Sequence, residues 1–137
     1  MATLIQGDSH IDERGTLRFI NGFALKGVRR FYQVENHRAG FIRAWHGHKR
    51  EEKFMYVAGG SAYVGVVDLK TKKIQKFVLS AEKPQILHIP ANTAHGFMNF
   101  TEDTKVIFFS TATLEESKKD DLRFPYDKWD IWNVKFY

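Results

Sequence analysis

The sequence lacks several features that would assign it to common classes of protein. None of its 137 residues is cysteine, which excludes disulfide bonds, thiolate nucleophiles and cysteine-ligated zinc or iron–sulfur centres. It has no apolar run of membrane-spanning length, and its N-terminus, MATLIQGDSH, has no basic segment followed by an apolar one. We therefore expect a cytoplasmic protein that does not contact a membrane.

Charge and composition are also without strong local bias. The net charge is +5, but lysine and arginine are interleaved with aspartate and glutamate, so no nucleic-acid partner is expected. No composition shift, internal repeat or low-complexity segment divides the chain. Because 43% of the residues are hydrophobic and the chain is long enough to close one core, we expect a single domain over residues 1–137.

Short alternating segments separated by turn residues recur along the chain, which is typical of an all-β sandwich or barrel. The absence of amphipathic helices between them favours antiparallel pairing, and we expect an antiparallel jelly-roll barrel. A helical turn is expected only at residues 114–119. The expected strands are residues 3–5, 16–21, 28–35, 41–45, 54–58, 61–68, 74–80, 85–89, 96–99 and 105–111.

The first of two histidine-containing stretches is GFIRAWHGHKREEKFMYVAG at residues 40–59. Side chains two apart on a strand point the same way, so alternation places Ile42 and Ala44 on the same face as His46 and His48. Two imidazoles then enter one cavity. Glu52 follows a short turn, and we expect it to return to the same cavity from the neighbouring strand.

The second stretch is IPANTAHGFMN at residues 89–99, and it brings His95 to the cavity from a distant strand. Imidazoles and a carboxylate in one barrel interior either bind a divalent metal or transfer protons. The sequence must decide between the two. The predicted cluster is His46, His48, Glu52 and His95.

The spacing within the two stretches resembles the two signature motifs of the cupin superfamily. The departures are Asn92 and Pro84, which stand where the second motif usually has glycine. On motif spacing alone, the resemblance implies a metal-dependent cupin whose ligands to iron, manganese or zinc are His46, His48, Glu52 and His95. Three histidines and one carboxylate would leave open positions for an oxygenase or a Lewis-acid enzyme.

Longer segments resemble one family of small cupins, the dTDP-4-keto-6-deoxysugar 3,5-epimerases and their 3,4-ketoisomerase relatives. These segments are DERGTL at 12–17, FYQVENHRAGFIRAWHGH at 31–48 and HIPANTAHGF at 88–97. The segment DLRFPYDKWDIW at 121–132 resembles the acidic, tryptophan-containing end of the epimerases. The resemblance implies a dTDP-linked sugar as substrate, no cofactor, and a homodimer formed by exchange of an N-terminal strand.

The resemblance also implies roles for individual residues in the reaction. His46 falls at the position of the family's catalytic base, and Tyr32 resembles a tyrosine that lines the sugar site of the ketoisomerases. His48 stands where the ketoisomerases have a second histidine and the epimerases have glutamine, which favours ketoisomerase. The epimerases have a tyrosine general acid where this chain has Phe108 and Phe109, so that proton donor is missing.

Four more residues are expected to bind the substrate by the same resemblance. Arg43 matches an arginine that holds the nucleotide-sugar, Lys53 a lysine near the substrate carbonyl, and His95 a histidine of the binding pocket. Arg14 matches an arginine that reaches the nucleotide, often in a partner subunit. Strict alternation would place Arg43 on the face opposite His46, so Arg43 reaches the cavity only if the strand twists or bulges.

The favoured reaction is a ketone shift from C4 to C3 through an enediolate, with His46 as the base and His48 relaying a proton. Three alternatives stay open: a 3,5-epimerase, the metal-dependent cupin, and a catalytically silent sugar-binding cupin. The aspartate that orients the epimerase histidine has no clear counterpart. Its candidates are Asp121, Asp127 and Asp130.

Overall fold

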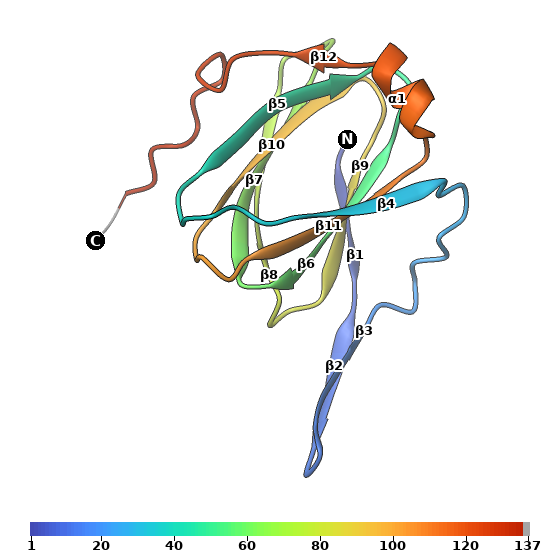
Figure 1. Ribbon diagram of the computed structural model, residues 1–137, viewed down its shortest axis with the longest axis vertical. Coiled ribbons are helices and arrows are strands. Elements are labelled where there is room, and N and C mark those ends of the chain that lie inside the picture. Colours follow the sequence, from blue (N-terminus) through green and yellow to red (C-terminus); the bar gives the residue numbers. More distant parts are fainter. Residues whose placement is uncertain (136–137) are drawn as a thin grey trace.

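The computed structural model describes residues 1–135, which form two five-stranded antiparallel sheets, a two-stranded hairpin and one short helix (Figure 1). The two larger sheets face each other, and this confirms the predicted antiparallel jelly-roll barrel. The elements are β1 (Thr3–Gln6), β2 (Asp8–Asp12), β3 (Gly15–Phe19), β4 (Arg30–Val34), β5 (Ile42–His48), β6 (Lys53–Gly59), β7 (Ser61–Asp68), β8 (Ile74–Ser80), β9 (Gln85–Ile89), β10 (Thr93–Asn99), β11 (Lys105–Ser110), α1 (Leu114–Lys119) and β12 (Leu122–Arg123).

Strand order shows how distant segments build each wall of the barrel. One sheet has the order β1-β9-β6-β11-β4 and the other β12-β5-β10-β7-β8. The predicted strands 61–68, 74–80 and 85–89 and the helical turn 114–119 form at those residues. β5 and β10 extend further than predicted, so the histidines of both motifs lie within paired strands.

Two strands were not predicted. β2 reads Asp-Ser-His-Ile-Asp, without the apolar alternation that marks a half-buried strand, and it pairs only with β3 in a hairpin that projects from the barrel (Figure 1). β12 has two residues and forms because the chain after α1 runs along the edge of β5. Its existence depends on a contact about 75 residues away in sequence rather than on a local pattern.

Apolar side chains form a core on each face of the β5-containing sheet. Between the two sheets the core includes Met55, Val64 and Leu87, all fully buried. On the outer face, the segment after β12 covers Trp45 and packs Trp132 against it, with ring centroids 5.2 Å apart. Both indole N–H groups donate to the Tyr126 carbonyl, at 3.1 and 3.0 Å. These bonds hold the C-terminal segment against the outer face of β5.

A bulge in β5 reverses the alternation that the sequence suggested. His46 pairs with His95 and Arg43 with Phe97, so β5 advances three residues while β10 advances two. The Ala44–Trp45 peptide bond inside the bulge is cis. Gly96 lies opposite, where an added Cβ would collide with the Ala44 side chain.

Because of the bulge, Arg43 and His46 both face the barrel interior, while Ile42 and Ala44 pack with Trp45 on the outer face. The expectation that Ile42 and Ala44 share a face with His46 is therefore wrong. The extra residue also supplies the bulge that Arg43 needed to reach the cavity.

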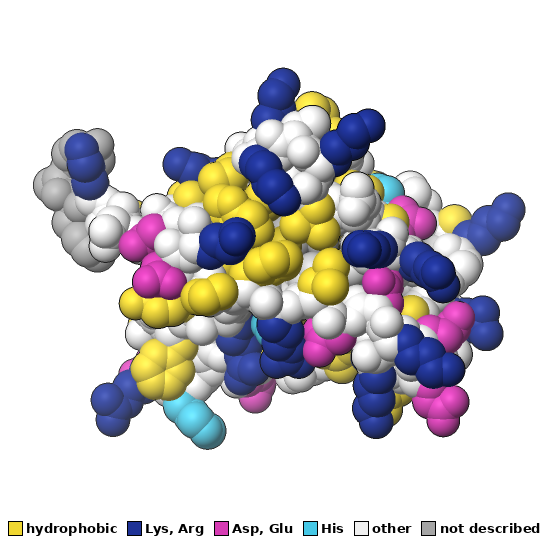
Figure 2. All heavy atoms as spheres, turned by 90° about the horizontal axis from the view of Figure 1, so that it is seen from above, with side chains coloured by type: hydrophobic (Ala, Val, Ile, Leu, Met, Phe, Trp, Pro, Cys, Tyr) yellow, Lys and Arg dark blue, Asp and Glu magenta, His cyan; other side chains and the backbone are white. Residues whose placement is uncertain are grey.

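On the face seen from above, basic side chains lie dispersed among acidic and apolar ones and do not form a continuous patch (Figure 2). Among the described residues, none of the helical structure has the length and apolar character required for a membrane span.

Candidate active site

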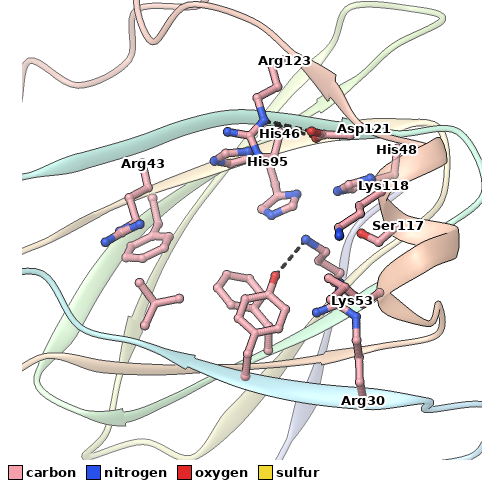
Figure 3. A pocket seen from close by; sticks show the side chains of 15 residues that line it. Arg30, Arg43, His46, His48, Lys53, His95, Ser117, Lys118, Asp121 and Arg123 are labelled. Atoms are coloured by element: carbon pink, nitrogen blue, oxygen red, sulfur yellow. Dashed lines mark hydrogen bonds and ion pairs between the residues drawn. The ribbon is translucent and has the colours of Figure 1, made fainter.

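The space between the two sheets opens into a cavity of about 390 Å³ beside α1 (Figure 3). The β5-containing sheet supplies one wall, with His46 and His48 from β5 and His95 from β10. The other sheet supplies the opposite wall, with Tyr32 from β4 and Lys53 from β6. The sequence motifs therefore meet, as predicted, in one interior.

The three histidines form a compact group, with the His95 ring centroid 6.0 Å from that of His46 and 6.2 Å from that of His48. His48 Nδ1 lies 2.7 Å from the Asp120 carbonyl oxygen. Since that oxygen only accepts hydrogen bonds, Nδ1 must carry the proton, and in the neutral ring Nε2 is an acceptor.

Two buried nitrogens in this group, His48 Nε2 and His95 Nδ1, have no hydrogen-bond partner within residues 1–135. Buried polar atoms are rarely left unpaired in folded proteins. These two atoms are therefore the places where polar groups of a ligand are expected to bind.

Burial keeps His46 and His95 neutral. Desolvation, followed by the positive charges of Arg123 and Lys53, lowers the pKa of His46 to about 4. Desolvation and the charge of Lys53 hold the pKa of His95 well below its ordinary value. Near neutral pH both rings are unprotonated, so His46 is able to accept a proton.

The opposite wall carries a lysine–tyrosine pair. Lys53 Nζ donates to the Tyr32 hydroxyl at 2.8 Å, and the Tyr32 ring stacks on Phe108 with centroids 5.2 Å apart. Burial lowers the pKa of Lys53, while the negative charge of Glu51 raises it. Burial, and then the same glutamate, raise the pKa of Tyr32, so its hydroxyl remains protonated.

Glu52 does not join the histidines, so the predicted four-residue cluster is wrong. Its carboxylate lies 2.7 Å from His88 Nε2, and its side chain is 41% exposed on the outer side of the barrel. The neighbouring Glu51 is the buried carboxylate, 1% exposed and 3.4 Å from His48 Nδ1. Since the inward face of β6 begins at Lys53, the preceding residue points outward.

Without Glu52, the metal-ligand set of His46, His48, Glu52 and His95 loses its carboxylate. Across residues 1–135, no three histidine, aspartate or glutamate side chains are grouped so that they would hold a metal ion. The histidine wall is therefore better suited to proton transfer, which imidazoles perform at neutral pH.

Basic side chains surround the mouth of the cavity. Arg43 points into the cavity because of the β5 bulge, and its Nε–H donates to Asn36 Oδ1 at 2.6 Å. Figure 3 shows Arg30 and Lys118 on the side of α1 and Arg123 above His46. These positive charges suit an anionic substrate.

The C-terminal segment adds Asp121 and Arg123 to the site because Arg123 pairs with His46 in the β12–β5 ladder. The Asp121 carboxylate and the Arg123 guanidinium form an ion pair, with Oδ2 3.1 Å from Nε. Of the three candidate aspartates, Asp121 lines the cavity, whereas Asp127 and Asp130 do not. The negative charge of Asp121 raises the pKa of His46 and so opposes the effect of burial.

Two predicted features lie elsewhere on the chain. Arg14, at the tip of the β2–β3 hairpin, pairs with Asp12 at 2.8 Å and is 83% exposed, outside its own chain's cavity. Phe109 faces the outer surface beside Phe31, so Phe108 is the residue that occupies the wall.

Sequence reasoning missed Glu51, Asp120 and the basic rim formed by Arg30, Lys118 and Arg123. Asp120 accepts hydrogen bonds from the backbone N–H groups of residues 49–51 at 2.8 to 2.9 Å, which orients the turn after β5. No local signal marks these residues, because their partners lie far away in the sequence.

Neutral imidazoles facing a lysine within a basic-rimmed jelly-roll barrel are typical of an enzyme that moves protons on an anionic substrate. The comparison with known families identifies the particular one. The family model described as dTDP-4-dehydrorhamnose 3,5-epimerase matches residues 2–133, so the chain belongs to this family of dTDP-sugar epimerases and isomerases. The resemblance inferred from the sequence is confirmed.

Individual relatives agree with this assignment. The chain is 30% identical over 106 residues to the spore coat polysaccharide biosynthesis protein SpsL of Bacillus subtilis (strain 168), covering 71% of this chain and 70% of the relative. The dTDP-4-dehydrorhamnose 3,5-epimerase of Sulfolobus tokodaii superposes with a TM-score of 0.81 and 26% identity, covering 98% of this chain and 82% of the other.

A 3,4-ketoisomerase from Helicobacter canadensis shares the same fold, with a TM-score of 0.71 and 22% identity over 93% of this chain and 92% of the other. The solved neighbours thus confirm the predicted cupin-type barrel. They include both kinds of reaction and so leave the choice between them to the site itself.

Proposed function

We propose that this protein is a sugar-nucleotide 3,4-ketoisomerase that moves the ketone of a dTDP-4-keto-6-deoxyhexose from C4 to C3. One observation carries the proposal: His46, His48 and His95 all belong to one wall, on the neighbouring strands β5 and β10. A sugar lying against this wall presents one face to all three imidazoles. A proton can then leave C3 and arrive at C4 on the same face.

His46 is the base in this proposal. It removes the C3 proton, which the C4 carbonyl acidifies, and the C3–H electrons form the C3–C4 double bond of an enediolate. His46 then returns its proton to C4 as the double-bond electrons move to that carbon. The neutral state of His46, produced by burial, suits it to accept the proton in the first step.

His48 completes the proton balance. The O3 hydroxyl must lose its proton as the C3 carbonyl forms, while O4 must gain one. His48 Nε2 is a buried acceptor without a partner among the described residues, so it can take the proton from O3 and deliver it to O4. The Asp120 carbonyl holds the ring in the required tautomer.

The opposite wall and the rim serve binding and charge stabilisation. Lys53, directed by its hydrogen bond to Tyr32, stabilises the negative charge that develops on the enediolate oxygens. Arg43 and the rim cations bind the diphosphate. The diphosphate would offset the charge of Arg123, which depresses the pKa of His46, and so make His46 a stronger base in the complex.

A 3,5-epimerase is the second candidate, and the position of Tyr32 favours it. In the β4–β11 ladder Tyr32 pairs with Phe108, which stands where the epimerases have their acid, and the Tyr32 ring lies beside it. Its hydroxyl therefore reaches the wall opposite His46 from the next strand. An acid facing a base across the sugar would invert a carbon centre rather than shift a ketone.

We also propose a homodimer in which Arg14 serves a partner's site. The hairpin that carries Arg14 projects from the barrel and exposes Ile11 and Leu17, which are 74% and 62% accessible. Covering them would bury apolar surface. Light scattering should give twice the monomer mass, and Arg14→Ala should weaken dTDP binding without changing that mass. A monomer that binds dTDP normally would contradict the assignment.

The reaction is tested by proton NMR of the purified, metal-analysed protein with dTDP-4-keto-6-deoxyglucose in heavy water. Deuterium at C3 or C4 together with a migrated ketone is the expected result. Exchange at both C3 and C5 would instead establish an epimerase. Nucleotide binding without exchange would indicate a catalytically silent sugar-binding protein. Absence of exchange together with stoichiometric bound metal would indicate a metal-dependent cupin.

A further inference from the structure

We infer that Glu51 is a positioning residue that holds Lys53 and His48 in their working geometry and fastens α1 against the cavity. The inference rests on the proposed function, because it assigns work to Lys53 and His48. Glu51 itself is not among the residues that line the cavity. Glu51 acts from behind the wall, where its side chain is 1% exposed.

The carboxylate of Glu51 is fully engaged by groups from separate elements. It accepts hydrogen bonds from Ser110 on β11 at 2.5 Å and from Ser117 on α1 at 2.6 Å. Three basic groups also face it: Arg30 Nη2 at 3.5 Å, His48 Nδ1 at 3.4 Å and Lys53 Nζ at 3.9 Å. A buried carboxylate is stable only with such partners.

Its first consequence concerns the charge of Lys53. Burial favours the neutral amine, and so do the positive charges of Arg30 and Arg123, whereas Glu51 and the more remote Asp121 oppose them. The Tyr32 hydroxyl also faces the ammonium and accepts its hydrogen bond. Glu51 is the carboxylate in ion-pair contact with Lys53, so its removal is expected to lower the pKa of Lys53.

Its second consequence concerns His48 and α1. The Glu51 carboxylate lies 3.4 Å from His48 Nδ1, the nitrogen that donates to the Asp120 carbonyl oxygen. Ser117 comes from the same helix whose Lys118 lines the mouth. One residue therefore connects the wall of β5, the start of β6 and the helix beside the opening.

The adjacent glutamate provides a matched control. Glu51→Gln removes one buried negative charge with little change of shape. Glu52→Gln makes the same chemical change at an outward-facing position that contacts His88. Both variants are compared with the wild-type protein for kcat, KM and the pH profile of ketone migration, each per folded molecule measured by circular dichroism.

For Glu51→Gln we expect kcat to fall about tenfold or more with KM changed less than about threefold, because the positive charge of Lys53, which Glu51 sustains, stabilises the enediolate more than the bound ketone. The alkaline limb of kcat should move to lower pH, since Lys53 loses its proton more easily. Glu51→Asp, which restores the charge, should recover part of this shift. Glu52→Gln should behave as wild type.

A second measurement does not depend on the reaction. In protein without substrate, nitrogen-15 NMR should show His48 protonated on Nδ1 and should give a lower Lys53 pKa in Glu51→Gln than in wild type. Should Glu51→Gln fail to fold, Ser117→Ala keeps the carboxylate and removes one of its donors. In this variant the NMR spectrum should show a smaller fraction of His48 protonated on Nδ1, while the chain remains folded.

The two proposals fail in different ways. If the wild type moves no ketone but the Lys53 pKa and His48 tautomer respond as expected, the reaction is wrong and the role of Glu51 in the site stands. If the wild type is active and Glu51→Gln matches Glu52→Gln in kcat, in pH profile and in Lys53 pKa, Glu51 has only a packing role and the inference is overturned.

Discussion

Burial acts in the same direction on the two walls of the cavity, but the walls face different charges. Desolvation favours the neutral form of every base, and it lowers the pKa of His46 and His95 on one wall and of Lys53 on the other. His46 and His95 face the positive charge of Lys53, which lowers their pKa values further. Lys53 faces Glu51, which opposes the shift. The buried carboxylate of Glu51 thus supports the positive charge of Lys53 on the charge-stabilising wall.

The walls also differ in what supports them. The histidine wall is held from outside by the C-terminal segment, through the β12–β5 ladder and the two tryptophans that bond to Tyr126. The opposite wall is held from inside, by the Lys53–Tyr32 hydrogen bond and the stacking of Tyr32 on Phe108. Substitutions on each wall should therefore have separable effects on chemistry.

The largest effect is expected from His46→Asn, which removes the base from the histidine wall. We expect kcat to fall about 10²- to 10⁴-fold, the usual contribution of a positioned general base. The dissociation constant for dTDP, measured by calorimetry, should change only a few-fold, because the rim cations remain. The control is His88→Asn, which removes an imidazole on the outer side of the barrel. A decrease of kcat of less than about tenfold would show that His46 is not the base.

A smaller effect is expected from Tyr32→Phe, which removes the hydroxyl from the opposite wall and keeps the stacking on Phe108. If one histidine performs both proton transfers, ketone migration should slow less than about tenfold, through the looser position of Lys53. A loss of 10² or more, with exchange surviving at C3 or C5 but no inversion of the carbon, would identify Tyr32 as a general acid. The comparison of the walls would then favour the epimerase.

Much of the barrel was predictable because it depends on local alternation. The segments 61–68 and 74–80 alternate in the manner of strands, and the structure has β7 and β8 at those residues. His46 and His95 were brought together by motif spacing, and the structure pairs them directly. Periodicity of two identifies a strand and its faces wherever the strand is regular.

The errors arose where side-chain direction depends on a distant partner. The bulge in β5 exists opposite Gly96, about 50 residues away, and it moves Arg43 into the cavity. The turn before β6 is held by Asp120, about 70 residues away, and it buries Glu51 instead of Glu52. Two adjacent glutamates cannot be ranked by local pattern when a tertiary contact decides which one faces inward.

The smallest effect concerns stability rather than activity. His46 has a folded-state pKa of about 4 against an ordinary value of 6.5, so below pH 6.5 the unfolded chain binds a proton that the folded chain does not. The stability associated with the neutral ring is complete above pH 6.5 and is lost as the pH falls to about 4. His95, whose pKa is also depressed by burial, acts in the same direction.

We therefore expect the melting temperature to fall by on the order of 5 °C between pH 7 and pH 4.5, measured by circular dichroism at fixed ionic strength. The carboxylates with lowered pKa values, such as Asp68 and Asp120, lose their stabilising charge only at lower pH, so they do not obscure this window. His46→Asn should make the slope shallower, and the part that remains is assigned to His95. A flat wild-type profile would mean that the histidine wall is not held neutral by burial, and the contrast between the two walls would lose its physical basis.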